Sequence, residues 1–244
     1  MAVYRLDLAY DGSGFKGYAR QQGQRTVQGE LESALTTILK APVVTSVAGR
    51  TDAGVHARRQ VVSFEHDGEI DLIALQRAVG GIIGPEISVL DASPEADDFN
   101  ARFSATWRRY RYRLDTNPSP DPLHRHVIWH TGRPLDFAVM KDTAEAMVGE
   151  HDFSSFCRSI EERSNVRRVT ELTLEEAGGL VDIWAQANAF CHQMVRSIVG
   201  YLYDVGRGFS DGDRVGEVIA ARDRGVVATV APAHGLSLWD VGYP

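Results

Sequence analysis

The residues best suited to chemistry lie close together, in residues 48–57. Asp52 stands there between Arg50 and His56, and glycines occupy positions 49 and 54. A glycine-rich segment after a predicted strand indicates a tight loop that exposes its backbone to a ligand. A neighbouring cation favours the charged form of a carboxylate, and nucleophilic catalysis needs that form. Asp52 is therefore the candidate nucleophile, although a lone aspartate more often caps a helix or forms an Asx turn.

A second candidate is a basic stretch in the middle of the chain. It holds five arginines and no acid within twelve residues: Arg102, Arg108, Arg109, Arg111 and Arg113. On a strand, Arg109, Arg111 and Arg113 would share one face, and Tyr110 and Tyr112 would share the other. The basic face could follow phosphates, or it could be an ordinary solvated sheet face. The interleaved aromatic residues in an acidic protein favour contact with nucleic acid.

A third candidate, Arg196, falls on the clearest amphipathic helix pattern in the chain. Apolar residues recur there at helical spacing: Met194, Val195, Ile198, Val199 and Leu202. An arginine beside such a stripe either extends its charge to the surface or forms half of a partly buried ion pair. The pattern alone leaves both interpretations open.

The elements that must position these residues are predicted from periodicity. Alternation of apolar and polar residues predicts strands at residues 4–10, 43–48, 61–64, 87–90, 110–114, 169–174, 181–187 and 236–239. Helical spacing predicts helices at 27–39, 72–82, 137–147 and 194–202, the first of them capped by Thr26. Strands and helices mix in two comparable halves. The predicted fold class is therefore α+β, with halves 1–104 and 105–244 that share a sheet.

Composition limits the classes of protein that remain. The chain has 244 residues, is 43% hydrophobic and carries a net charge of −7. It has no apolar run of about 18 residues and no recognisable secretory signal, so no membrane span is expected. Two cysteines, Cys157 and Cys191, are too few for a disulfide framework. Two buried or half-buried thiols in a reducing cytoplasm are the expectation.

Four blocks of the sequence resemble one family. Residues 49–56, Gly-Arg-Thr-Asp-Ala-Gly-Val-His, are similar to the catalytic motif of the tRNA pseudouridine synthase A family. The other blocks follow in the family's order: residues 10–13, residues 102–112, and residues 188–190 with 194–200. Tyr18 and the pair Gly80 and Gly81 depart from the usual pattern. The resemblance spans nearly the whole chain.

The resemblance implies an isomerase that converts uridine to pseudouridine at positions 38, 39 and 40 of the tRNA anticodon arm. It assigns Asp52 to attack on the nucleoside or to abstraction of a ribose proton. Tyr110 would stack on the uracil, Arg196 would pair with Asp52, and Arg50 would assist base flipping or contact RNA. It also implies the pseudouridine synthase fold with a continuous, mainly antiparallel sheet and a central basic cleft. The resemblance implies that the reaction needs neither a metal nor an organic cofactor. It also implies that the protein forms a homodimer.

Two other functions fit parts of the pattern. A non-catalytic RNA-binding protein would use the arginines and Tyr110 but not Asp52. An aspartate-dependent hydrolase would need a second acid or a metal near the nucleophile, and the loop sequence offers neither. Three histidines, at positions 124, 126 and 130, are weak candidates for metal ligands because no cysteine and few acids accompany them.

Overall fold

The computed structural model describes residues 1–158 and 164–244. It forms two compact units, one of Met1–Thr106 with Ser237–Pro244 and one of Trp107–Leu236. The first boundary lies close to the one expected from the sequence. Residues Ser237–Pro244, expected in the second half, belong instead to the first unit, because the last strand, β10 (Leu236–Gly242), pairs with a strand of that unit. The α+β class is confirmed.

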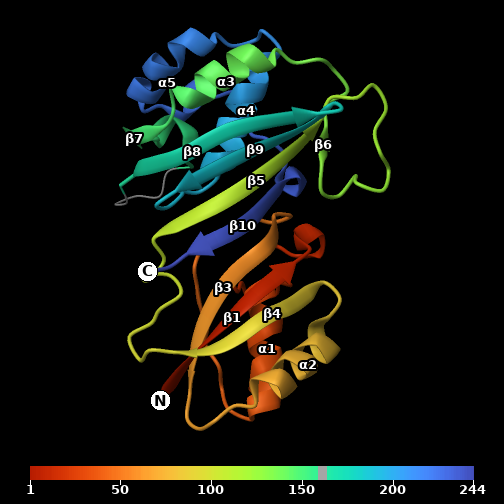
Figure 1. Ribbon diagram of the computed structural model, residues 1–244, viewed down its shortest axis with the longest axis vertical. Helices are drawn as coiled ribbons and strands as arrows, with labels where there is room; N and C mark the ends of the chain where they lie inside the picture. The colour runs from red at the N-terminus through yellow and green to blue at the C-terminus, as the bar shows by residue number, and fades with distance from the viewer. Residues whose placement is uncertain (159–163) are drawn as a thin grey trace. The chain divides into compact units, whose positions relative to one another are not determined.

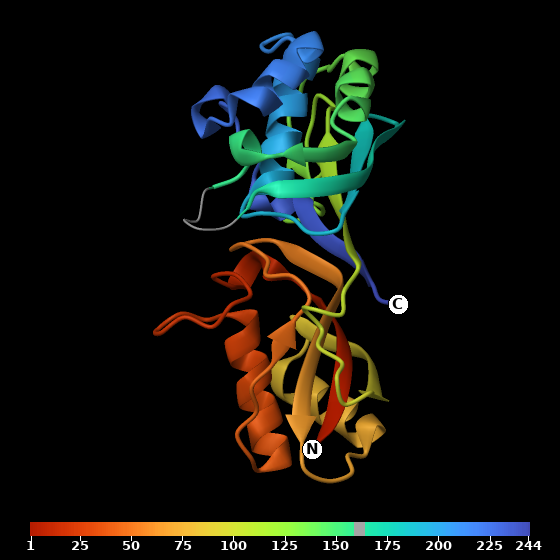
Figure 2. The ribbon, with the colours of Figure 1, turned by 90° about the vertical axis from the view of Figure 1, so that its left-hand side faces the viewer.

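The first unit is a sheet of four main strands with two helices. The strand order is β4-β1-β3-β10, with β1 at Ala2–Tyr10, β3 at His56–His66 and β4 at Ile87–Glu95. Strand β1 is antiparallel to both β3 and β4, whereas β10 is parallel to β3. The two-residue β2 (Ser46–Val47) adds to β3. Helix α1 (Val27–Leu39) lies along the strands in Figure 2, and α2 (Leu72–Ile83) contacts it.

Local sequence explains both β1 and α1. Leu6 and Leu8 are fully buried on the inner face of β1, as the alternating pattern predicts. Helix α1 begins where expected, because the Thr26 side chain accepts a hydrogen bond from the backbone nitrogen of Gly29. Leu31 and Leu35, one turn apart, are fully buried. These residues form much of the core under the sheet.

The second unit is an antiparallel sheet covered by helices. Its order is β5-β9-β8-β7, with β5 at Trp107–Asp115, β7 at Gly149–Asp152, β8 at Val166–Ala177 and β9 at Leu180–Ala187. The short β6 (Trp129–His130) runs parallel to β5. Helices α3 (Phe137–Glu145), α4 (Met194–Gly206) and α5 (Val215–Ala221) gather above these strands in Figure 1.

Helix α4 differs from the amphipathic helix that the sequence predicts. Nearly every residue is buried, including Ser197, Gly200 and Asp204. A Cβ at Gly200 would clash with the carbonyl oxygen of Thr229, so only glycine lets this segment approach so closely. A helix that is buried all round is a core helix. Side chains on α4 are therefore held from several sides.

The two cysteines depart from expectation. Cys157 and Cys191 form a disulfide, with Cα atoms 5.7 Å apart, where the sequence led us to expect two thiols. They meet because the segment after Phe156 runs beside the segment before α4, where Arg158 N donates to His192 O. Disulfides are typical of oxidising compartments, so the two cysteines do not indicate a reducing one. Among the described residues, no helix is both long enough and apolar enough to cross a membrane.

Candidate active site

Asp52 lies in the loop of residues 48–55, between β2 and β3 in the first unit. Val55 N donates to Asp52 O at 3.1 Å, which closes a turn over Ala53 and Gly54. Gly54 has φ 79°, the left-handed value that the third residue of a type II turn needs. Asp52 itself is half-buried. The loop thus has a defined conformation that depends on glycine, as the sequence predicted.

The chain between β1 and α1 packs closely against this loop. Tyr18 N donates to Thr51 O at 3.0 Å. A side chain at Gly12 would clash with the carbonyl of Val55, and one at Gly17 would come within 3.1 Å of the carbonyl oxygen of Thr51. Both glycines are therefore required for the close approach of two backbones. The block at residues 10–13 and the block at residues 49–56 are thereby brought together.

His56 directly follows the Asp52 loop. It is buried as the first residue of β3, where its Nδ1 accepts from Gly12 N at 3.1 Å. The same nitrogen lies 3.1 Å from an oxygen of Asp11. The imidazole therefore joins the loop's end to the turn after β1. Arg50, by contrast, is exposed, as a residue that contacts RNA must be.

Tyr110 lies in the second unit on the inner face of β5. It is 7% exposed, and its ring meets the ring of Phe190 edge-on, with centroids 5.2 Å apart. Its neighbour Arg108 is also buried and donates to Asn188 O at 2.9 Å. Two blocks that resemble the family, at residues 102–112 and 188–190, are thus packed against each other. The edge-on contact restricts the tilt of the Tyr110 ring.

Arg196 is half-buried on α4 and has a fixed stem. Its Nε donates to Ala231 O at 2.8 Å, and Ala231 N donates back to Arg196 O at 3.0 Å. The guanidinium is therefore oriented by the segment that runs beside α4. The stem of the side chain is thus fixed, and the pairing of Arg196 with Asp52 stays a prediction.

Arg109, Arg111 and Arg113 of β5 share a face, as predicted, but they have acidic partners. Arg109 Nη2 lies 2.7 Å from Glu171, and Arg113 makes two bonds to Asp182, at 2.7 and 2.6 Å. Arg111 Nε lies 3.9 Å from the same Asp182. Burial lowers the pKa of Arg111, and the hydrogen bond to Asp182 raises that of Arg113. The positive charge of these three arginines is therefore partly neutralised by acids on β8 and β9.

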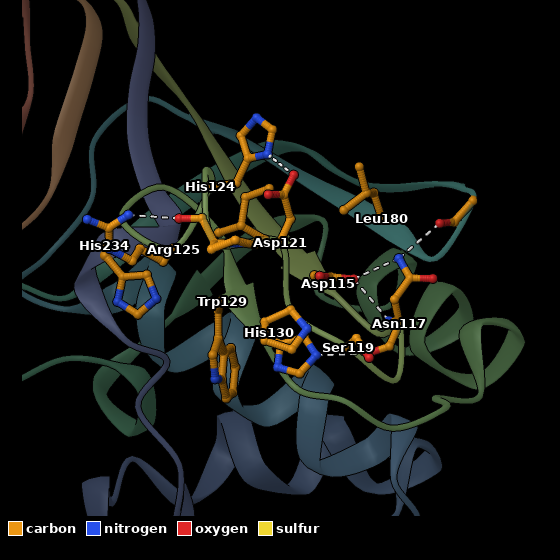
Figure 3. A pocket seen from close by; sticks show the side chains of 14 residues that line it. Asp115, Asn117, Ser119, Asp121, His124, Arg125, Trp129, His130, Leu180 and His234 are labelled. Carbon is orange, nitrogen blue, oxygen red and sulfur yellow. Dashed lines mark hydrogen bonds and ion pairs between the residues drawn. The ribbon is translucent and has the colours of Figure 1, made fainter.

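A cavity of about 680 Å³ lies elsewhere in the second unit, and Figure 3 shows the side chains around it. His124 and His130 are both on its lining. His124 Nδ1 is 2.6 Å from an oxygen of Asp121, and His130 Nε2 is 2.8 Å from Asn117 O. No group of three or more potential metal-binding side chains exists within residues 1–158 and 164–244. None of Asp52, Tyr110 and Arg196 lines this cavity.

Comparison with known proteins decides between the remaining functions. A family profile described as tRNA pseudouridine synthase matches residues 143–244. The chain is 44% identical over 254 residues to tRNA pseudouridine synthase A of Streptomyces griseus, an alignment that covers 98% of this chain and 87% of that protein. The chain belongs to the tRNA pseudouridine synthase A family. The relative from Frankia casuarinae is 44% identical, with 98% and 89% covered, and that from Cutibacterium acnes is 40% identical, with 100% and 90% covered.

Proposed function

We propose that this protein is an isomerase that converts uridine to pseudouridine in tRNA, at positions 38, 39 and 40. Membership of the tRNA pseudouridine synthase A family over almost the full chain is the observation that carries the proposal. The glycosidic bond between C1′ and N1 breaks, the uracil turns, and C1′ bonds to C5. N1 gains a proton and C5 loses one, so no oxidant, reductant or cofactor is required.

Within this reaction, Asp52 is the nucleophile or base. The rigid turn of residues 52–55 supports that role, because a reacting group must be held close to one geometry. Tyr110, half of an edge-on aromatic pair, stacks on the target uracil. Arg196, whose stem is fixed by Ala231, serves as the ionic partner of Asp52. Arg50, exposed beside Asp52, contacts the RNA or occupies the space that the flipped base leaves.

Contact with tRNA phosphates by Arg109, Arg111 and Arg113 remains part of the proposal. Each of these arginines lies near Glu171 or Asp182, so a phosphate would compete with a protein carboxylate for the same guanidinium. Phosphate contacts add affinity that falls as salt rises.

The direct experiment is incubation of the protein alone with an unmodified tRNA transcript, followed by mapping of pseudouridine at each nucleotide. Pseudouridine at positions 38 to 40 without added metal, and with chelator present, is the expected result. Modification only at other positions would overturn the site assignment. Binding without any modification would favour the non-catalytic RNA-binding alternative.

A homodimer in the cytoplasm completes the proposal. The tRNA substrate supports this compartment, and two copies would offer a longer basic surface to an elongated RNA. Light scattering at micromolar concentration should therefore give twice the chain mass of 26.9 kDa. A mass of one chain under these conditions would contradict the dimer.

A further inference from the structure

Three polar side chains lie buried beneath the Asp52 loop, within the first unit. Gln60 is 0% exposed on β3, Tyr10 is 4% exposed at the end of β1, and Thr51 is 7% exposed in the loop. Burial of polar side chains is costly unless they are hydrogen-bonded. These three are bonded to one another and to the loop backbone, next to the proposed nucleophile.

The three side chains form a continuous chain of hydrogen bonds. Gln60 Nε2 donates to Gly49 O at 2.7 Å and to the Tyr10 hydroxyl at 3.3 Å. The Tyr10 hydroxyl in turn lies 2.8 Å from Thr51 Oγ1, and either oxygen can donate in that bond. Burial raises the pKa of Tyr10 to about 12, so the phenol keeps its proton at neutral pH.

The residues on both sides of Arg50 are bonded to side chains on strands. Gly49 is bonded to Gln60 of β3, and Thr51 is bonded to Tyr10 of β1. Both bonded residues come directly before the turn that begins at Asp52. Sites supported by strands are positioned more precisely than sites supported by loops alone. We propose that Tyr10 and Gln60 are positioning residues, which fix the backbone of the Asp52 loop for catalysis. The inference rests on the proposed role of Asp52.

The test is the single-turnover rate of Tyr10→Phe and Gln60→Met, measured with saturating enzyme, together with the Kd for tRNA. We expect the rate to fall about tenfold for Tyr10→Phe and up to about 100-fold for Gln60→Met, with Kd unchanged. Thr51→Val should lower the rate as Tyr10→Phe does. The double variant Tyr10→Phe with Gln60→Met should be slowed by less than the product of the two single effects, because both changes remove the bond between Gln60 and Tyr10.

Tyr4→Phe is the matched control. Tyr4 lies on the same strand, is 6% exposed, and donates to Gly68 O at 2.9 Å, away from the loop. It should lose as much thermal stability as Tyr10→Phe and keep the wild-type rate. A wild-type rate in Tyr10→Phe, with Asp52→Asn inactive, would overturn the positioning role alone. Activity in Asp52→Asn would overturn the proposed role of Asp52 instead, and a wild-type protein that forms no pseudouridine would overturn the proposed function.

Discussion

The Asp52 loop and the arginine strand β5 are the two segments that sequence spacing marks for function, and their polar groups are bonded differently. In the loop, glycines and buried side chains hold the backbone of residues 49–55 from several sides. On β5, Arg109 and Arg113 bond to acids on neighbouring strands. In the loop, these contacts fix the backbone around Asp52. On β5, the ion pairs also link neighbouring strands of the sheet. Substitutions should therefore affect catalysis in the loop and mainly stability on the strand.

After Asp52→Asn, the largest effect is expected from Arg196→Met, which removes the proposed partner of the loop's aspartate. If Arg196 pairs with Asp52, its loss removes the cation that favours the charged carboxylate. The chemical step should slow by 100-fold or more, on the order expected for a lost charged partner of a reacting group. Single-turnover rates measure the loss.

Arg196→Lys is the control for charge alone. It should recover part of the rate, since lysine keeps the charge but cannot bond through a planar guanidinium. A Met variant with a near wild-type rate would show that Arg196 is not the partner of Asp52.

Gly12→Ala tests how tightly the loop is held. The added methyl group would meet the carbonyl of Val55, so the loop must shift. We expect a rate loss of up to about 100-fold from the displaced reacting group, with a stability loss of about 1–3 kcal/mol from overpacking. Thermal melting and single-turnover kinetics give the two values.

Gly80→Ala is the matched control for that variant. Gly80 lies on α2 with nothing within 4 Å of an added Cβ. It should keep the wild-type rate and gain about 0.5–1 kcal/mol, because alanine favours a helix. A Gly12→Ala enzyme with the wild-type rate would mean that the close packing at Val55 is not needed for catalysis.

The smallest catalytic effect is expected on the strand. Arg113→Ala should leave the rate near wild type and cost about 1 kcal/mol of stability, since a half-buried ion pair with Asp182 is lost. If Arg113 contacts a phosphate, as proposed, the slope of log K against log salt for tRNA binding should become shallower by about 0.7–0.9. An unchanged slope would show that Arg113 stays with Asp182.

The difference between the two segments also explains what the sequence could predict. The helix after Thr26 and the strand at Ala2–Tyr10 follow local patterns, and both were found where expected. The strand expected at residues 43–48 is only Ser46–Val47, and α5 was not predicted. These short elements depend on tertiary packing more than on periodicity.

Within the candidate site, the sequence predicted the loop but not its supports. The acids that pair with Arg109 and Arg113 lie 62 and 69 residues further along the chain, and only strand pairing brings them near. Gln60 did carry a signal. It is a polar residue directly before the apolar pair Val61 and Val62, at a position that the strand buries completely. A buried polar residue in a strand indicates a specific hydrogen-bonding role.

The most direct measurement is pseudouridine formation by Asp52→Asn under single-turnover conditions, beside the wild-type protein. Asparagine has nearly the same shape but is neither a nucleophile nor a base at neutral pH. The account predicts no pseudouridine at positions 38 to 40 with Asp52→Asn, while tRNA binds as tightly as to the wild type. Turnover above a few per cent of the wild-type rate would contradict the central claim that Asp52 performs the chemistry.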